Sequence, residues 1–74
     1  MATIEANDCV AEIGKTAGKV WHTLSEEGPM SFPRLARELG AHRDIVMQAV
    51  GWLAREGKIA IEEGTRGRIV SLKA

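Results

Sequence analysis

A change of apolar period at residue 58 constrains the fold of this chain more than any other feature. Up to Glu56 the apolar residues recur three and four positions apart, which is the period of a helix, and glycine or proline interrupts the pattern twice. From Lys58 onward apolar and polar residues alternate, which is the period of a strand. We therefore expect helices first and a β-hairpin after them.

The first helix is expected to start at Asn7 or Asp8, either of which can cap it, and to end near Ser25 before a Gly-Pro pair. One stripe at helical spacing should face the core, and it consists of Val10, Ile13, Ala17, Val20 and Leu24.

Two shorter helices should follow. Ser31 is a cap residue, Pro33 lies in the first turn where its missing N–H costs nothing, and Gly40 is a typical helix end. The third helix is expected to run from around His42 to about Glu56, with the next glycine as its stop.

The hairpin is expected to begin at Lys58, turn over residues 64–67 and return from Arg68 to Lys73. The pattern also allows a very short extra strand near Met30. We expect the buried core to contain Leu24, Leu35, Leu39, Val46, Val50, Leu53, Ile59 and Ile61.

The run Ser-Phe-Pro-Arg-Leu-Ala-Arg-Glu-Leu-Gly at 31–40 resembles the first helix and turn of bacterial winged helix-turn-helix domains. The run Ala-Val-Gly-Trp-Leu-Ala-Arg-Glu-Gly-Lys-Ile at 49–59, together with residues 13–21, resembles a family of short, stand-alone winged helix domains of bacteria and archaea that is largely uncharacterised. The resemblance covers residues 10–73. It implies a small, mostly helical α+β fold with three helices and a two-stranded wing, in a single domain over 1–74 with a core at about 8–73.

Composition narrows the class of protein. The longest apolar run is three residues, which excludes a membrane span, and the start of the chain lacks the basic and apolar segments of a secretory signal. A single cysteine, Cys9, cannot form an internal disulfide and fits a reducing cytosol. These features favour a cytoplasmic protein.

Charge is balanced overall but divided along the chain. Ten basic and ten acidic residues cancel, which does not favour a strongly electrostatic polyanion binder. Residues 1–32 carry two lysines and five acidic residues, a net −3, whereas residues 33–74 carry eight basic and five acidic residues, a net +3. An anionic partner should therefore meet the second half of the chain.

Catalysis is the function class that the sequence supports least. His22, His42 and Cys9 do not have metal-ligand spacing, and no pair of acids accompanies a nucleophile. A chain of 74 residues also leaves little room for an enclosed substrate pocket. We therefore expect no enzyme, metal, cofactor or small-molecule substrate.

The fold that the resemblance implies suggests a DNA-binding, transcription-regulatory domain that takes double-stranded DNA. In helix-turn-helix domains the second helix of the pair enters the major groove with its amino-terminal side chains at the base edges. On the third helix, Arg43 can read guanine, Gln48 adenine, and Met47 a thymine methyl group. Phosphate contacts are expected from Arg34, Arg37, Lys58, Arg66 and Arg68. The alternative is an ordinary solvated polar face.

A surplus of apolar helix surface favours a second function, a protein–protein interaction module. Ile45 and Trp52 lie beside the core stripe of the third helix, and Ala11, Gly14 and Gly18 form a stripe of small residues on the first. Trp52, or the other tryptophan at position 21, either fills the small groove within the chain or anchors a homodimer or partner interface. The sequence leaves both alternatives open.

Overall fold

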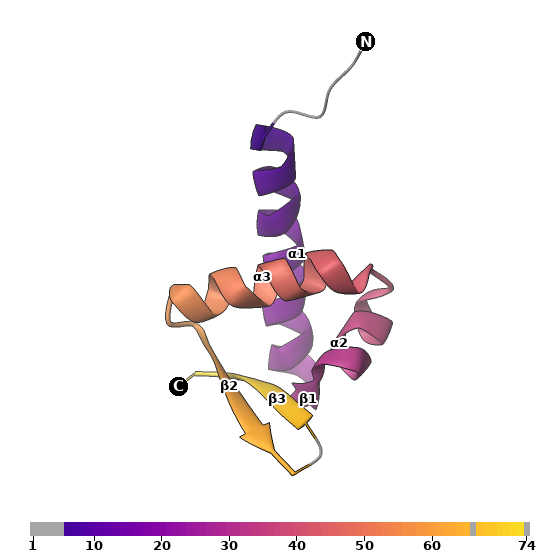
Figure 1. The fold of residues 1–74 in the computed structure, drawn as a ribbon, viewed down its shortest axis with the longest axis vertical. Helices are drawn as coiled ribbons and strands as arrows, with labels where there is room; N and C mark the ends of the chain where they lie inside the picture. Colours follow the sequence, from indigo (N-terminus) through magenta and orange to yellow (C-terminus); the bar gives the residue numbers. More distant parts are fainter. Residues whose placement is uncertain (1–5, 66, 74) are drawn as a thin grey trace.

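The computed structural model describes residues 6–65 and 67–73, which form three helices and a three-stranded antiparallel sheet (Figure 1). In chain order the elements are α1 (Ala6–Glu27), β1 (Met30–Ser31), α2 (Phe32–Leu39), α3 (Arg43–Arg55), β2 (Ile59–Gly64) and β3 (Gly67–Leu72). The expected three helices and hairpin are confirmed, as is the very short strand at Met30. Across these two ranges no helix is both long and apolar enough to cross a membrane.

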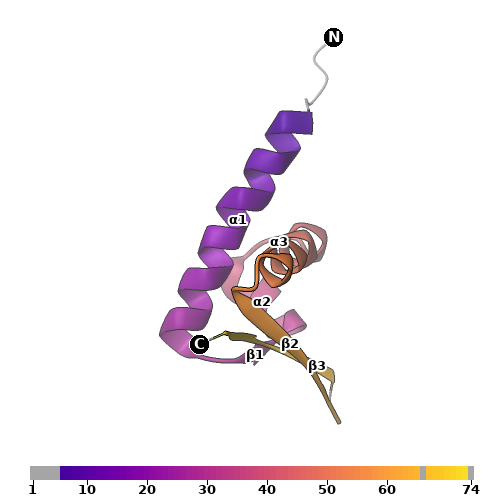
Figure 2. The ribbon, with the colours of Figure 1, turned by 90° about the vertical axis from the view of Figure 1, so that its left-hand side faces the viewer.

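Helix α1 is longer than expected and extends past the rest of the molecule. It begins at Ala6, so Asn7 and Asp8 lie inside its first turn and the expectation that either caps it is wrong. Its carboxyl-terminal half packs beside α3 and the sheet, while its amino-terminal half projects beyond them (Figures 1 and 2). Val10 on the projecting half is therefore 66% exposed, which contradicts its expected inward position.

The boundaries of α2 follow from its terminal residues. The Ser31 hydroxyl accepts a hydrogen bond from the Arg34 amide at 3.3 Å and so caps the helix, with proline in the first turn as expected. At the other end Gly40 has a φ of 62°, and its amide donates to the Arg37 carbonyl oxygen while the Ala41 amide donates to that of residue 36. This is a Schellman motif, which needs a residue in the left-handed region and so favours glycine.

The same motif ends α3 and directs the chain into the wing. Gly57 has a φ of 75°, and the Lys58 amide donates to the Leu53 carbonyl oxygen at 3.0 Å. Strand β2 then pairs with β3, and β3 pairs on its other edge with β1, in the order β1-β3-β2. The sheet thus fastens the wing to the segment that precedes α2.

The core lies where α1, α2 and α3 meet the inner end of the sheet. It consists of Ala17, Val20, Leu24, Met30, Leu35, Val46, Ala49, Val50, Leu53, Ile59 and Val70. Leu39, expected to be buried, is only partly buried at its edge. Ile61 is 39% exposed and its expected burial is wrong, because β2 is buried only at its first residue and then leaves the cover of the helices.

Candidate nucleic-acid interface

The outer side of α3 is the exposed face that the sequence predicts. Val46, Ala49, Val50 and Leu53 turn into the core, and this orientation leaves the opposite side of the helix to solvent. The residues exposed there are Arg43, Asp44, Met47, Gln48, Gly51 and Arg55. Asp44 in the first turn is the acidic member of this otherwise basic or neutral set.

A hollow of about 350 Å³ joins the amino-terminal end of α3 to the wing. Arg43 and Met47 line it from α3, and Arg68 lines it from β3. Its remaining lining comes from Ser31, Phe32, Pro33 and Gly67, which the sequence did not single out for this site. Three of the predicted DNA-contacting residues therefore lie around one concave surface. The short pairing of β1 with β3 holds the wing against the start of α2.

Two of the predicted phosphate contacts already have acidic partners. Arg34 lies 3.5 Å from Glu27 and 3.9 Å from Glu38, measured between side-chain nitrogen and oxygen atoms. Arg68 Nε lies 3.7 Å from Glu63 Oε1, across the ladder between β2 and β3. These side chains are 35–76% exposed, so each ion pair contributes at most about 1 kcal/mol and can open to meet a phosphate.

The remaining predicted DNA contacts either have no acidic partner or lie on other surfaces of the molecule. Arg37 and Arg43 are exposed and have no ion-pair partner within 4.0 Å among residues 6–65 and 67–73. Gln48 lines a separate hollow of about 500 Å³ beside α1, and Lys58 lines a third one. The predicted contact at Arg66 falls outside the described residues.

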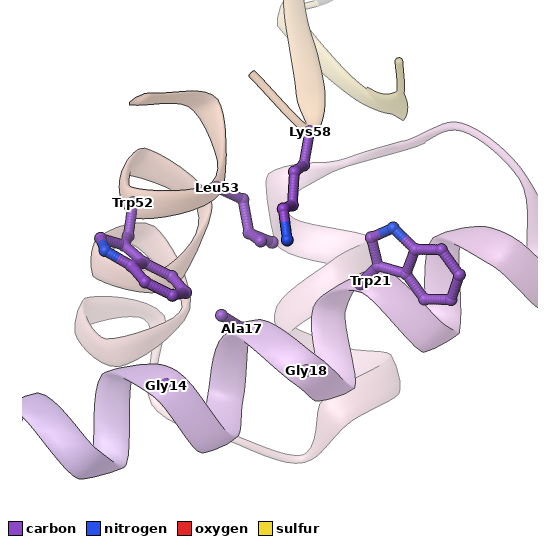
Figure 3. Close-up of a pocket in the computed structure, with 7 residues that line it drawn as sticks. All are labelled: Gly14, Ala17, Gly18, Trp21, Trp52, Leu53 and Lys58. Atoms are coloured by element: carbon purple, nitrogen blue, oxygen red, sulfur yellow. The ribbon is translucent and has the colours of Figure 1, made fainter. Parts of the chain in front are cut away.

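The third hollow, of about 290 Å³, lies between α1 and the carboxyl-terminal end of α3 (Figure 3). Its floor is formed by Gly14, Ala17, Gly18 and Leu53, and its sides by Trp21 and Trp52. The Lys58 side chain points into it between the two indoles (Figure 3). We call this hollow the tryptophan groove. Lys58 therefore does not share a surface with Arg43 and Arg68.

The interpretation that a tryptophan fills the small-residue groove and completes the core is wrong. Trp21 is 46% exposed and Trp52 is 49% exposed, so both rings stand at the sides of the groove and leave it open. Ala49 is buried on the face of α3 that packs against α1, between Ile45 and Trp52 in sequence. Ile45 and Thr16 consequently line the hollow of about 500 Å³ on one side of α1. Trp52 lines the tryptophan groove on the other side.

No cluster of metal-ligating side chains is present in the part of the chain that the structure describes. Within it, no three His, Cys, Asp or Glu side chains gather closely enough to hold a metal ion. Cys9 is exposed and unpaired on the projecting half of α1. His22 lies 3.6 Å from Glu26, one turn further along the same helix, at the surface.

The fold and the sequence are both similar to known proteins. A family model described as a winged helix-turn-helix domain (DUF2582) matches residues 7–72. An uncharacterised protein of Methanocaldococcus jannaschii, MJ1608, is 37% identical over 68 residues, which span 89% of this chain and 97% of that protein. The solution NMR structure of protein BT2368 from Bacteroides thetaiotaomicron has a TM-score of 0.77 and 40% identity, over 84% of this chain and 76% of that one.

Proposed function

Because the chain belongs to the winged helix-turn-helix family whose model matches residues 7–72, we propose that it binds double-stranded DNA as a small transcription-regulatory domain. The observation that carries the proposal is the hollow in which Arg43 and Met47 of α3 meet Arg68 of the wing. This arrangement gives one surface both base-reading and phosphate-binding side chains. Binding to chromosomal DNA places the activity in the cytoplasm, and the domain takes no part in catalysis and needs no cofactor.

The side chains have distinct parts in this proposal. The amino-terminal end of α3 enters the major groove, where Arg43 donates to guanine, Gln48 pairs with adenine and Met47 contacts a thymine methyl group. Arg37 and Arg68 bind phosphates on either side of the helix, and Arg34 does so once its acidic partners release it. Lys58 has no role in DNA binding, because its side chain lies in the tryptophan groove.

The expected affinity is modest and depends on salt. With three phosphate contacts, from Arg34, Arg37 and Arg68, the slope of log K against log salt concentration is about −2.7. Raising the salt from about 50 mM to about 200 mM should then weaken binding by about 40-fold. Fluorescence anisotropy with a labelled mixed-sequence duplex measures both quantities.

A matched pair of variants tests the assigned surface. Arg43→Gln and Lys58→Gln each remove one exposed positive charge, but only the first lies on the proposed interface. Arg43→Gln should weaken binding by about 1–3 kcal/mol and relax the preference for guanine, whereas Lys58→Gln should leave affinity and preference unchanged. Equal losses in the two variants would show that only net charge matters, and no binding of the unaltered chain at low salt would reject the proposal.

A second function, as a protein–protein interaction module, is favoured by one specific observation. Two large aromatic side chains, Trp21 and Trp52, stand half-exposed at one groove on a chain of 74 residues. Tryptophan is among the residues most enriched at the energetic centres of protein interfaces. The groove lies on the α1 side of α3, so this function and DNA binding use different faces of the molecule.

A further inference from the structure

The tryptophan groove has one cationic group in an otherwise apolar lining. Among the described residues, its lining consists of the two indoles, the floor of small residues and Leu53, with Lys58 as the single charged side chain. The ammonium group of Lys58 reaches the space between Trp21 and Trp52 (Figure 3). The groove therefore offers a positive point charge beside aromatic and aliphatic surface.

This positive charge has no acidic partner in the described parts of the chain. Arg34 and Arg68 each lie within 4.0 Å of a carboxylate, whereas Lys58 has no carboxylate at that distance among residues 6–65 and 67–73. No acidic side chain of these two ranges lines the groove either. An anion that enters the groove consequently meets the ammonium group without competition, and a cation is repelled by it.

We propose that the tryptophan groove binds, as a ligand, a small carboxylate with an aromatic body. The ring of the ligand lies over Gly14 and Gly18 between the two indoles, and its carboxylate accepts hydrogen bonds from the ammonium group of Lys58. This groove and the proposed DNA interface are on different faces of the molecule, so the inference does not rest on DNA binding.

The lining of the groove selects this class of ligand. An ammonium group is a compact point charge that one carboxylate neutralises, whereas a phosphate is bound best by several donors or by the fork of an arginine. A wholly apolar ligand would cover the ammonium group without pairing it, which is unfavourable. A ring joined to a carboxylate suits both parts of the lining, because aromatic pairs gain more than the area that they bury.

The floor of the groove is open because two of its residues are glycines. A Cβ atom built at Gly14 or Gly18 would meet no other part of the chain within 4 Å, so a side chain at either position would extend into the groove. Glycine lowers the stability of a helix interior relative to alanine. The two glycines thus leave room for a ligand ring at a cost to the helix.

The dimensions of the groove restrict the ligand to a small one. Its volume of about 290 Å³ lies at the lower end of the range of about 300–1,000 Å³ that is typical of ligand pockets. The two indoles are 46% and 49% exposed, so a bound ligand stays partly in contact with water. We therefore expect a carboxylate with a single ring to bind with a dissociation constant on the order of 1 mM.

An NMR titration of the full chain with phenylacetate tests the proposal, with phenylacetamide and 2-phenylethylammonium as the neutral and cationic controls. The sequence has two tryptophans, so the spectrum contains two indole N–H signals, and both report on the groove. Phenylacetate should shift both signals and the amides of Gly14 and Gly18, phenylacetamide should bind about fivefold more weakly, and the cation more weakly still. Equal affinity for the three probes, or no shift with about 10 mM phenylacetate, would overturn the proposal.

Two charge variants separate the role of Lys58 from an effect of net charge. Lys58→Gln changes an exposed side chain and should weaken the binding of phenylacetate about fivefold, with no change for phenylacetamide. Lys19→Gln removes the same charge from the hollow on the other side of α1 and should leave the affinity for both probes unchanged. Equal losses of phenylacetate affinity in the two variants would contradict the assignment of the carboxylate to Lys58.

Two leucine variants test the position of the ring. Gly18→Leu places a side chain on the floor of the groove and should abolish the binding of phenylacetate. Gly51→Leu, on the outer side of α3 where a Cβ atom is equally unobstructed, should bind it like the unaltered chain. Circular dichroism checks that both variants fold, and the comparison of Lys58→Gln with Lys19→Gln decides the matter if Gly18→Leu does not. Undiminished binding to a folded Gly18→Leu variant would reject the tryptophan groove as the site.

Discussion

Replacing Glu63 by glutamine is expected to strengthen DNA binding, because the carboxylate of Glu63 competes with phosphate for Arg68. The Arg68 Nε and Glu63 Oε1 atoms are 3.7 Å apart, and both side chains are mostly exposed, at 58% and 76%. At this separation two unit charges in bulk water attract by about 1 kcal/mol, which is the upper limit for the pair after screening by salt. Breaking the pair before Arg68 meets DNA therefore costs at most about fivefold in affinity.

Glu62→Gln is the matched control for this prediction. It changes the net charge from zero to +1 just as Glu63→Gln does, at the adjacent position of the same strand. Successive side chains of a strand point to opposite faces, and Glu62 pairs in the ladder with Ile69 and not with Arg68. Anisotropy titrations should give a gain of about two- to fivefold for Glu63→Gln and a smaller one for Glu62→Gln. An equal or larger gain for Glu62→Gln would refute the reasoning from the ion pair.

The remaining predictions concern the framework that holds the site. In a urea titration, Leu35→Ala removes a fully buried side chain and should lower the free energy of unfolding by about 2–5 kcal/mol. Ile61→Ala, at a residue that is 39% exposed, should lower it by less than about 2 kcal/mol. Ser31→Ala removes the cap of α2 and should lower the free energy of unfolding by about 1 kcal/mol, whereas Ser31→Thr should retain most of the stability. A loss below about 0.3 kcal/mol for Ser31→Ala would show that the 3.3 Å hydrogen bond is unimportant for stability.

Local signals in the sequence were sufficient for the helix boundaries near α2 and α3. Ser31 with proline two residues later predicts a helix start, and Gly40 predicts a helix end, because caps and left-handed turns depend on a few adjacent residues. The alternation after Lys58 likewise predicts the hairpin. These features need no knowledge of how the elements pack.

The sequence could not predict features that depend on where one helix crosses another. Val10 belongs to the apolar stripe of α1, yet it is exposed because α3 and the sheet cover only the other end of that helix. Trp52 is exposed because the smaller Ala49 lies where α3 packs against α1. No periodicity in the sequence marks the position of that crossing.

The sequence likewise predicted some residues of the candidate site and misplaced others. The exposure of Arg43 and Met47 follows from the helical period alone, and the structure places them together with Arg68. Lys58 was assigned to the same surface because it is basic and adjacent to the wing, but the turn at Gly57 directs it into the tryptophan groove. The sequence signals for that groove are the stripe of small residues at Ala11, Gly14 and Gly18 and the two tryptophans at positions 21 and 52.

An NMR titration with duplex DNA tests most directly the claim that α3 and the wing form the nucleic-acid interface. A chain of 8.0 kDa gives a resolved amide spectrum, in which every backbone position outside the two prolines reports on its own surroundings. We predict that added duplex shifts the amides of residues 43–48 and 67–69, and that those of Gly14, Gly18 and Trp52 stay in place. Shifts centred on the tryptophan groove, or none at low salt with a mixed-sequence duplex, would contradict the account.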